Sequence, residues 1–195
     1  MILYFAPGAC SLADHIALHE ADMTFDRIKV DLKAHATEDG RDYYHINPKG
    51  YVPALALDDG YVLTENIAIL AWIADQRSRL APQVAHGRYR LLETLAFIST
   101  EIHKGFKPFF APGASAADKA KAGETIGARL DLIAGQVEGP WLFGPEFTVA
   151  DPYLYVMLTW AKNQGLAIPG ALDAFYESMR LRPAVQLARQ HEGLA

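Results

Sequence analysis

The residues best suited to chemistry begin with Cys10, the only cysteine of this 195-residue chain. It follows the turn residues Pro7-Gly8 and directly precedes a helical pattern that includes Leu12 and Ile16. Free N–H groups at a helix start favour an anion, and a cysteine there can have its pKa lowered from about 8.5 to roughly 3.5–7.5. A thiol buried among apolar groups stays protonated instead, so a reactive and a packing interpretation of Cys10 are both open.

The neighbours of Cys10 limit its chemistry. Ser11 is a residue type that caps helices, and Asp14 follows it by three positions, as in a capping box. Position 13 is an alanine, so the chain has no C-x-x-C pair. Any disulfide of Cys10 must therefore be formed with another molecule.

Two further stretches could bind a peptide-like ligand. Val52-Pro53 opens a predicted strand, and because proline cannot donate to a sheet ladder, it marks either an edge or a strand start. At an open edge the Val52 backbone could pair with an extended ligand. Glu65 and Asn66, after Thr64, stand at the start of an apolar helix. They could hold the ammonium and carboxylate of an amino-acid-like ligand, although a glutamate there also simply favours the helix dipole.

The histidines offer weaker signals. Ile102 continues an apolar helical stripe, which places His103 and Lys104 toward its border, where they could face another part of the molecule. His15 and His19 are spaced i, i+4 like half of a metal site, but no H-E-x-x-H motif accompanies them. We expect no third ligand and no metal, and we expect the remaining histidines in polar surroundings to lie on the surface: His45, His86 and His191.

Composition excludes several partners. The net charge is −5, and no run of Lys or Arg forms a basic stripe, which argues against nucleic acid or an anionic membrane. No segment approaches about 18 uninterrupted apolar residues. We therefore expect a cytoplasmic protein, in which a single unpaired cysteine fits a reducing compartment.

The elements that position these residues follow a β-α-β, then β-β-α order. The predicted strands are 2–5, 25–30, 52–57 and 61–63, the last two forming a hairpin around Asp58-Asp59-Gly60. Helices are predicted after Cys10 and over 65–76, and residues 31–47 are expected to form a weak helix or a loop.

A composition shift marks a second domain. We assign 1–78 to the first domain, 79–87 to a linker that contains Pro82, and 88–195 to an all-helical domain. Apolar stripes predict one long helix that reaches Ile102 and another over 126–137. A further helix starts at Thr148 as N-cap with Asp151 in its first turn, and two short helices follow over 172–179 and 184–190.

These signals coincide in one family: the chain resembles the glutathione transferases, specifically the bacterial beta class. The resemblance spans essentially the whole sequence. Its most specific blocks are Pro7-Gly8-Ala9-Cys10-Ser11-Leu12-Ala13, Asn47-Pro48-Lys49-Gly50-Tyr51-Val52-Pro53-Ala54-Leu55, Leu63-Thr64-Glu65-Asn66-Ile67-Ala68-Ile69, Glu101-Ile102-His103-Lys104-Gly105-Phe106 and Phe147-Thr148-Val149-Ala150-Asp151.

The resemblance implies a thioredoxin-like N-terminal domain that binds glutathione, a helical domain that forms the pocket for a hydrophobic electrophile, and a homodimer. It implies that Pro53 is cis, that the Val52 backbone pairs with the cysteinyl part of glutathione, and that Cys10 can form a mixed disulfide with its sulfur. The implied catalytic residues are Cys10, His103 and Ser11. The implied glutathione-binding residues are Cys10, His35, Tyr51, Val52, Pro53, Glu65, Asn66, Thr100, Glu101, His103 and Lys104.

Four positions depart from the family pattern. His35 stands where a lysine commonly binds the glycyl carboxylate, so that contact would depend on imidazole charge. Phe5 replaces a common tyrosine, with Tyr4 on the opposite face of the strand. Tyr51 stands where glutamine is frequent, and Ala96 where asparagine is frequent.

The predicted function is conjugation of the glutathione thiol to electrophiles, with glutathione as co-substrate, no metal and some thiol–disulfide exchange. One alternative is a non-enzymatic carrier or interaction protein of the same fold. Another is a specialised glutathione-dependent isomerase or dehalogenase.

Overall fold

The computed structural model describes residues 1–194, which begin with a mixed sheet. Within that range the sheet has five strands in the order β3-β2-β1-β4-β5. Strand β1 pairs in parallel with β2 and antiparallel with β4, while β3 and β5 extend the two sides in antiparallel fashion. The strands are β1 (Ile2–Phe5), β2 (Asp26–Asp31), β3 (Ala36–Thr37), β4 (Ala54–Ala56) and β5 (Val62–Thr64).

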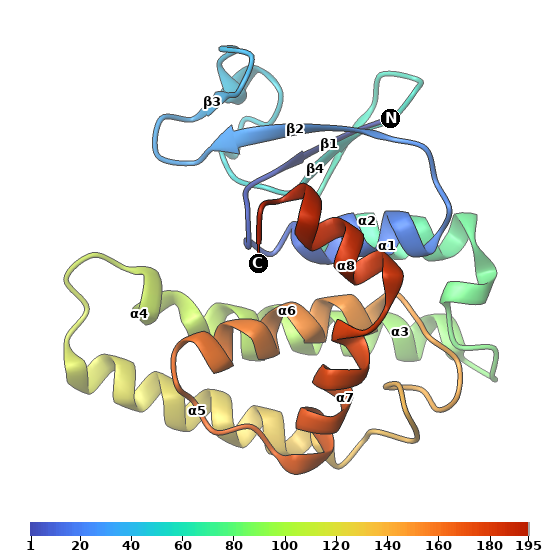
Figure 1. Ribbon diagram of the computed structural model, residues 1–195, viewed down its shortest axis with the longest axis vertical. Coiled ribbons are helices and arrows are strands. Elements are labelled where there is room, and N and C mark those ends of the chain that lie inside the picture. The colour runs from blue at the N-terminus through green and yellow to red at the C-terminus, as the bar shows by residue number, and fades with distance from the viewer. Residues whose placement is uncertain (195) are drawn as a thin grey trace.

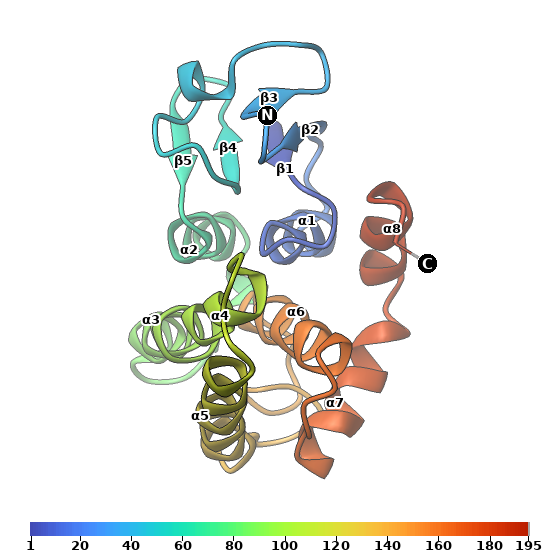
Figure 2. The ribbon, with the colours of Figure 1, turned by 90° about the vertical axis from the view of Figure 1, so that its left-hand side faces the viewer.

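Helices α1 (Leu12–Glu20) and α2 (Asn66–Gln76) cover one face of this sheet (Figure 2). Leu3 and Phe5 point into the core beneath these helices, whereas Tyr4 packs in a second cluster on the opposite face with Tyr43. This alternation is the two-residue period of a strand. It confirms that Tyr4 cannot substitute for the tyrosine absent at position 5.

The predicted β-α-β and β-β-α order is confirmed. The predicted hairpin is formed by β4 and β5, with Ala54 opposite Thr64. Residues 31–47 hold the short strand β3 and a 3-10 turn at Tyr43–His45, so the expectation of a loop is closer than that of a helix. The Val52-Pro53 bond is cis, as the resemblance implies. It precedes β4, an inner strand, so Pro53 marks a strand start rather than an edge.

The remainder is helical and, except for α8, lies below α1 and α2 in Figure 1. Its helices are α3 (Gly87–Phe97), α4 (Lys107–Phe110), α5 (Ala116–Ala134), α6 (Ala150–Asn163), α7 (Gly170–Arg180) and α8 (Pro183–His191). The single helix predicted to run through Ile102 is wrong in detail. After α3 the backbone forms a π-helical turn over Ile98–Ile102 and then a 3-10 turn over His103–Phe106. Such a change of hydrogen-bond pattern re-aims the side chains that follow it, here His103.

Helix α6 crosses the core and is buried almost throughout. The predicted N-cap at Thr148 is wrong by one residue, because the N-cap of α6 is Val149 and no side chain caps the helix. Thr148 and Asp151 are nevertheless bonded: Asp151 accepts from the Thr148 N–H at 2.6 Å, and the Thr148 hydroxyl accepts from the Ala150 N–H at 3.3 Å. Asp151 also accepts from the Leu142 N–H at 2.9 Å. The motif therefore ties the loop before α6 to its first turn.

Helix α8 returns to the N-terminal part and packs against α1 (Figures 1 and 2). Arg182, just before α8, makes a two-pronged contact with Glu20 at 2.6 and 2.8 Å. As a result α1 is enclosed by the sheet, α2, α6 and α8. Among the described residues, no helix combines the length and apolarity needed to cross a membrane.

Candidate functional site

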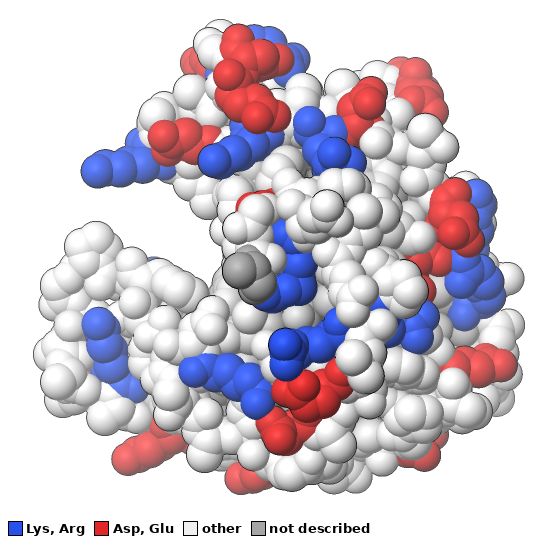
Figure 3. All heavy atoms as spheres, viewed as in Figure 1, with Lys and Arg blue, Asp and Glu red and all other residues white. Residues whose placement is uncertain are grey.

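A cleft of about 630 Å³ separates the sheet-bearing part from the helices. Figure 3 shows the molecule hollowed between these two parts on the left of the view, where most exposed atoms are uncharged. Eight residues of the predicted site line this cleft: Cys10, Tyr51, Val52, Pro53, Glu65, Asn66, His103 and Lys104. The other lining residues are Ile67, Ala68, Ala71, Leu92, Ser99 and Tyr153.

Cys10 lies at the inner end of the cleft, partly buried, with Sγ 3.5 Å from the Val52 carbonyl oxygen. Burial raises the pKa of this thiol to about 12, and the nearby Asp14 carboxyl adds to the increase. Backbone N–H groups at the helix start lower the pKa, but by less than burial raises it. The thiol is therefore protonated at neutral pH and donates to the Val52 carbonyl oxygen. The site thus raises the pKa of Cys10 and does not lower it.

Ser11 does not face the cleft. Its side chain is fully buried, and its hydroxyl lies 3.2 Å from the Ala6 nitrogen and 3.4 Å from the Ala6 oxygen. The hydroxyl makes no capping bond to α1, so the predicted cap is wrong. The side chain instead closes the turn through Pro7-Gly8, which is why it is not directed at a ligand sulfur.

Asn66 holds the Cys10 turn in place. Its amide nitrogen donates to the Cys10 carbonyl at 2.9 Å and to the buried Asp14 carboxyl at 2.8 Å. The start of α2 and the start of α1 are thereby joined at the floor of the cleft.

Glu65 forms a cation site at the cleft mouth. Its carboxylate accepts from the Lys49 ammonium at 2.5 Å and from the Tyr51 hydroxyl at 2.7 Å. Burial alone would raise the pKa of Glu65. The two hydrogen bonds and the Lys49 charge together lower the pKa by more than burial raises it, so the net pKa is below the usual value. The Lys49 ammonium also donates to the Thr64 hydroxyl at 3.0 Å. Sequence reasoning missed Lys49, which the Asn47-Pro48-Lys49-Gly50 turn brings opposite β5.

His103 faces the cleft from the helical side. Its Nδ1 lies 2.8 Å from the hydroxyl oxygen of Tyr153. Its ring packs edge to face against the Trp160 ring, with 5.0 Å between the ring centroids. Burial, with the adjacent Lys104 charge, lowers the pKa of His103 to about 4, so the ring is neutral at pH 7. Burial also raises the pKa of Tyr153 above its ordinary value, so its hydroxyl keeps its proton.

Sequence reasoning missed Tyr153 and Trp160. Both belong to the apolar pattern of α6, and nothing in that pattern distinguishes a tyrosine that packs from one that bonds a site histidine. Their role is set only where α6 passes beneath the 3-10 turn of His103.

Three predicted glutathione residues are not among those that line the cleft. His35 donates from Nδ1 to the Gly50 carbonyl at 3.0 Å and packs against the Tyr44 ring at 4.6 Å. The Thr100 hydroxyl donates to the Ala96 carbonyl at 3.0 Å. Glu101 pairs with Arg129 at 3.0 Å. Their assignment to glutathione stays a prediction.

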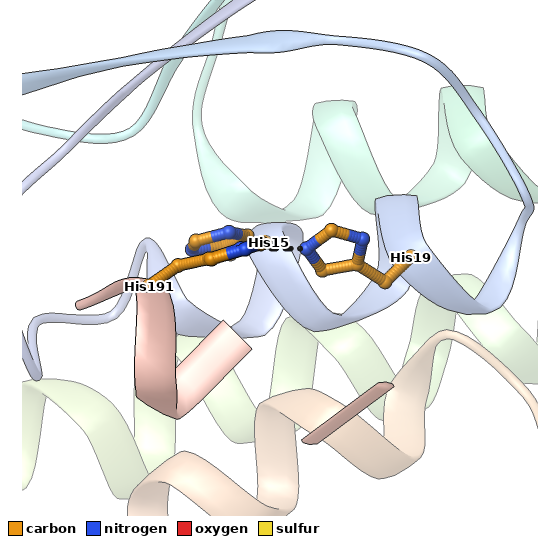
Figure 4. Close-up of side chains that lie close together, drawn as sticks. All are labelled: His15, His19 and His191. Atoms are coloured by element: carbon orange, nitrogen blue, oxygen red, sulfur yellow. Dashed lines mark hydrogen bonds between the residues drawn. The ribbon is translucent and has the colours of Figure 1, made fainter. Parts of the chain in front are cut away.

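One histidine expected on the surface lies elsewhere. His191, at the end of α8, is half-buried beside His15 and His19 of α1 (Figure 4). The expectation that His15 and His19 have no third histidine beside them is wrong, because α8 folds back over α1 and brings His191 to them.

Known proteins resemble this chain over its whole length. A family model described as glutathione S-transferase, N-terminal domain, matches residues 9–76. The glutathione S-transferase GstA of Escherichia coli O157:H7 is 42% identical, with 100% of both chains covered. A sphingomonad glutathione S-transferase complexed with glutathione is 47% identical with a TM-score of 0.91, and a bacterial beta-class glutathione S-transferase of Sphingomonas chungbukensis is 43% identical with a TM-score of 0.91. Each structure and this chain are covered to 100%.

Proposed function

The chain belongs to the glutathione S-transferase family and is a transferase with bacterial beta-class relatives; we propose that it joins the thiol of glutathione to hydrophobic electrophiles in the cleft between sheet and helices. The observation that carries this proposal is the convergence of eight predicted residues, from four separate stretches of the chain, on one cavity. A relative of 47% identity is complexed with glutathione, which supports glutathione as the co-substrate here.

The γ-glutamyl end of glutathione carries an ammonium and a carboxylate. The contact of Glu65 with the Lys49 ammonium supports the assignment of Glu65 to the ligand ammonium, which would take the place of that lysine. The N–H groups at the start of α2, beside Asn66, would attract the ligand carboxylate.

The cysteinyl part would pair with the Val52 backbone, beside Pro53. In this position its sulfur would lie between Cys10 on the sheet side and His103 on the helical side. A neutral His103 can stabilise a thiolate only by donating a hydrogen bond. Tyr153 keeps its proton and donates a hydrogen bond to Nδ1 of His103. The single proton of the neutral ring is then on Nε2, which can donate a hydrogen bond to the sulfur.

A second activity is favoured by the place of Cys10 on the cleft wall. In the proposed exchange the Cys10 thiol loses its proton to solvent, and its sulfur attacks oxidised glutathione. The S–S bond of that disulfide breaks, a Cys10–glutathione S–S bond forms, and one glutathione thiolate leaves and takes up a proton. Because burial raises the pKa of Cys10, this exchange is expected to be slow at neutral pH.

Conjugation is tested by steady-state kinetics with glutathione and a panel of aryl halides and peroxides. Saturation in glutathione, with turnover lost in His103→Ala, is the expected result. Retention on immobilised glutathione without turnover of any substrate would contradict the proposed conjugation and favour a carrier.

Storage of glutathione on Cys10 is tested by intact mass after incubation with oxidised glutathione. An adduct of glutathione mass on the wild type, absent from Cys10→Ala, is expected. An equal adduct on the variant would end the exchange proposal and leave conjugation unaffected.

We also propose that the enzyme is a cytoplasmic homodimer, as the resemblance implies. Exposed aromatic side chains, among them Tyr89 and Phe110, leave apolar surface that a second copy could cover. Light scattering coupled to size exclusion would give a mass near 43 kDa, about twice the 21.5 kDa chain, and a mass of one chain would contradict the dimer.

A further inference from the structure

Three imidazoles converge where α8 returns to α1, on the far side of α1 from the cleft. His15 and His19 are one turn apart on α1, and His191 ends α8 (Figure 4). One ligand nitrogen from each ring lies within 4.8 Å of the other two. We propose that this cluster is a binding site for a divalent ion of the zinc class, held by His15, His19 and His191, which fastens α8 to α1.

His15 has a nitrogen that lacks a partner. The side chain is fully buried, and Nδ1 bonds Glu192 Oε1 at 2.9 Å. Nε2 is buried with no hydrogen-bond partner among the described residues. An orphaned buried polar atom of this kind is costly, and a metal ion at Nε2 would satisfy it.

Glu192 supplies the outer contact that such sites use. A histidine that binds a metal through one nitrogen commonly donates the other N–H to a carboxylate, which fixes the ring and adds negative charge. Glu192 is buried on the ring side opposite the free Nε2, and its second oxygen accepts from the Gly8 N–H at 2.8 Å. With an ion at Nε2, His15 would donate from Nδ1. Burial raises the pKa of Glu192 to about 8 without an ion, so Glu192 would lose its proton on binding and then balance part of the positive charge.

The spacing is close to that of a tetrahedral ion. Two nitrogens bound at 2.0–2.1 Å in tetrahedral geometry lie about 3.3 Å apart. His19 Nε2 and His191 Nδ1 are 3.3 Å apart and share a hydrogen bond, which an ion would replace. The other nitrogen–nitrogen distances in the cluster are at most 4.8 Å, and rotation of the imidazole rings would shorten them to about 3.3 Å. His19 and His191 are only half-buried, which leaves room for their side chains to rotate. Three imidazoles leave a fourth position for water.

The ligand type selects the ion. Neutral imidazole suits Zn²⁺, Ni²⁺ and Cu²⁺, whereas Ca²⁺ and Mg²⁺ prefer oxygen ligands. Burial lowers the pKa of His15 to about 3 and of His19 to about 4, so neither ring has to lose a proton at pH 7. The positive charge of Arg27, which also lowers these pKa values, opposes the ion.

The site would couple the C-terminal helix to the turn before Cys10. Glu192 contacts both His15 and Gly8, and Trp160 of α6 donates to the Gly8 carbonyl at 2.9 Å. An ion on the three rings would hold α8, and with it Glu192, against this turn. The expected effect is on stability, since none of the three rings lines the cleft.

The test uses the full chain without a histidine tag, stripped with chelator, in the Cys10→Ala background so that the thiol cannot bind the ion. Calorimetric titration with Zn²⁺ alone is expected to give one ion per chain. At a hundredfold excess of Zn²⁺ over Kd, Tm should rise by roughly 5–10 °C, and Ca²⁺ should not change it. Substituted Co²⁺ should give the visible spectrum of a tetrahedral ion.

Matched variants separate this site from chance binding. His191→Ala removes a half-buried ring and should weaken Zn²⁺ binding by roughly 100-fold, whereas the exposed His45→Ala should leave it unchanged. Glu192→Gln should weaken it by about 10-fold. The absence of a Zn²⁺-dependent Tm shift in the parent, or equal Zn²⁺ affinity in His191→Ala and His45→Ala, would overturn the proposal.

Discussion

Tyr153→Phe removes one oxygen atom, and with it the hydrogen bond that orients His103. The Tyr153 hydroxyl is 2.8 Å from His103 Nδ1; Tyr153 is fully buried and His103 is partly buried. In the proposed mechanism this bond keeps the ring proton on Nε2, facing the sulfur of glutathione. Without it, the ring can place its proton on Nδ1 and offer no donor to the sulfur.

The magnitude follows from the burial of the pair. A buried group left without its partner costs about 1–3 kcal/mol, and we expect the loss at the thiolate to lie near the lower end because the ring itself remains. A loss of about 1.4 kcal/mol lowers kcat/KM about tenfold. The same free energy raises the pKa of bound glutathione by about one unit. KM for glutathione should change little, because the γ-glutamyl contacts are untouched.

The assay is the pH dependence of kcat/KM, together with the ultraviolet absorbance of bound thiolate. Tyr155→Phe makes the same chemical change two residues away on α6, at a position that does not line the cleft, and should leave the pH profile in place. An unshifted profile in Tyr153→Phe, or an equal shift in both variants, would refute the role of the Tyr153 hydroxyl.

Three further predictions test the site and its support. Glu65→Gln should raise the Kd of glutathione about tenfold in a calorimetric titration by removing a charge-assisted contact, whereas Glu138→Gln, which breaks an ion pair outside the cleft, should not. Asp151→Ala should lower the free energy of unfolding by on the order of 3 kcal/mol in denaturant titrations at pH 7, because three hydrogen bonds are lost in the core. The control is Asp118→Ala, which removes the exposed capping box of α5. A loss of stability in Asp151→Ala no larger than that in Asp118→Ala would contradict this prediction. Since burial raises the pKa of Asp151 to about 6, the folded state binds the proton more tightly than the unfolded state does. The free energy of unfolding of the wild type should therefore fall as the pH rises from about 4 to 6, with a slope that Asp151→Ala lacks. Iodoacetamide should modify Cys10 on the order of a thousandfold more slowly at pH 8 than a free thiol, as followed by mass spectrometry; a rate equal to that of the denatured chain would disprove the raised pKa.

The sequence by itself determined the order of elements and the composition of the site. Strand alternation and helical stripes are local, so the β-α-β and β-β-α order and the all-helical remainder could be predicted from side-chain period alone. The motifs around Cys10, Val52-Pro53, Glu65 and His103 identified a family, and eight of their residues meet in one cleft. The π-helical and 3-10 turns around His103 escaped prediction, because its apolar stripe continues through a change of backbone hydrogen bonding.

Only the tertiary structure decided the chemical state of these groups. A helix start lowers the pKa of a thiol, yet burial beneath the helical part raises that of Cys10, because desolvation depends on residues distant in the chain. The hydroxyl of Tyr153 and the ammonium of Lys49 gain their roles in the same way, through contacts across 50 and 16 positions. His191 reads as a surface residue until α8 folds back and places it against α1. Residue types and spacing thus state which chemistry is available, and the packing of distant elements determines where protons and ions are held.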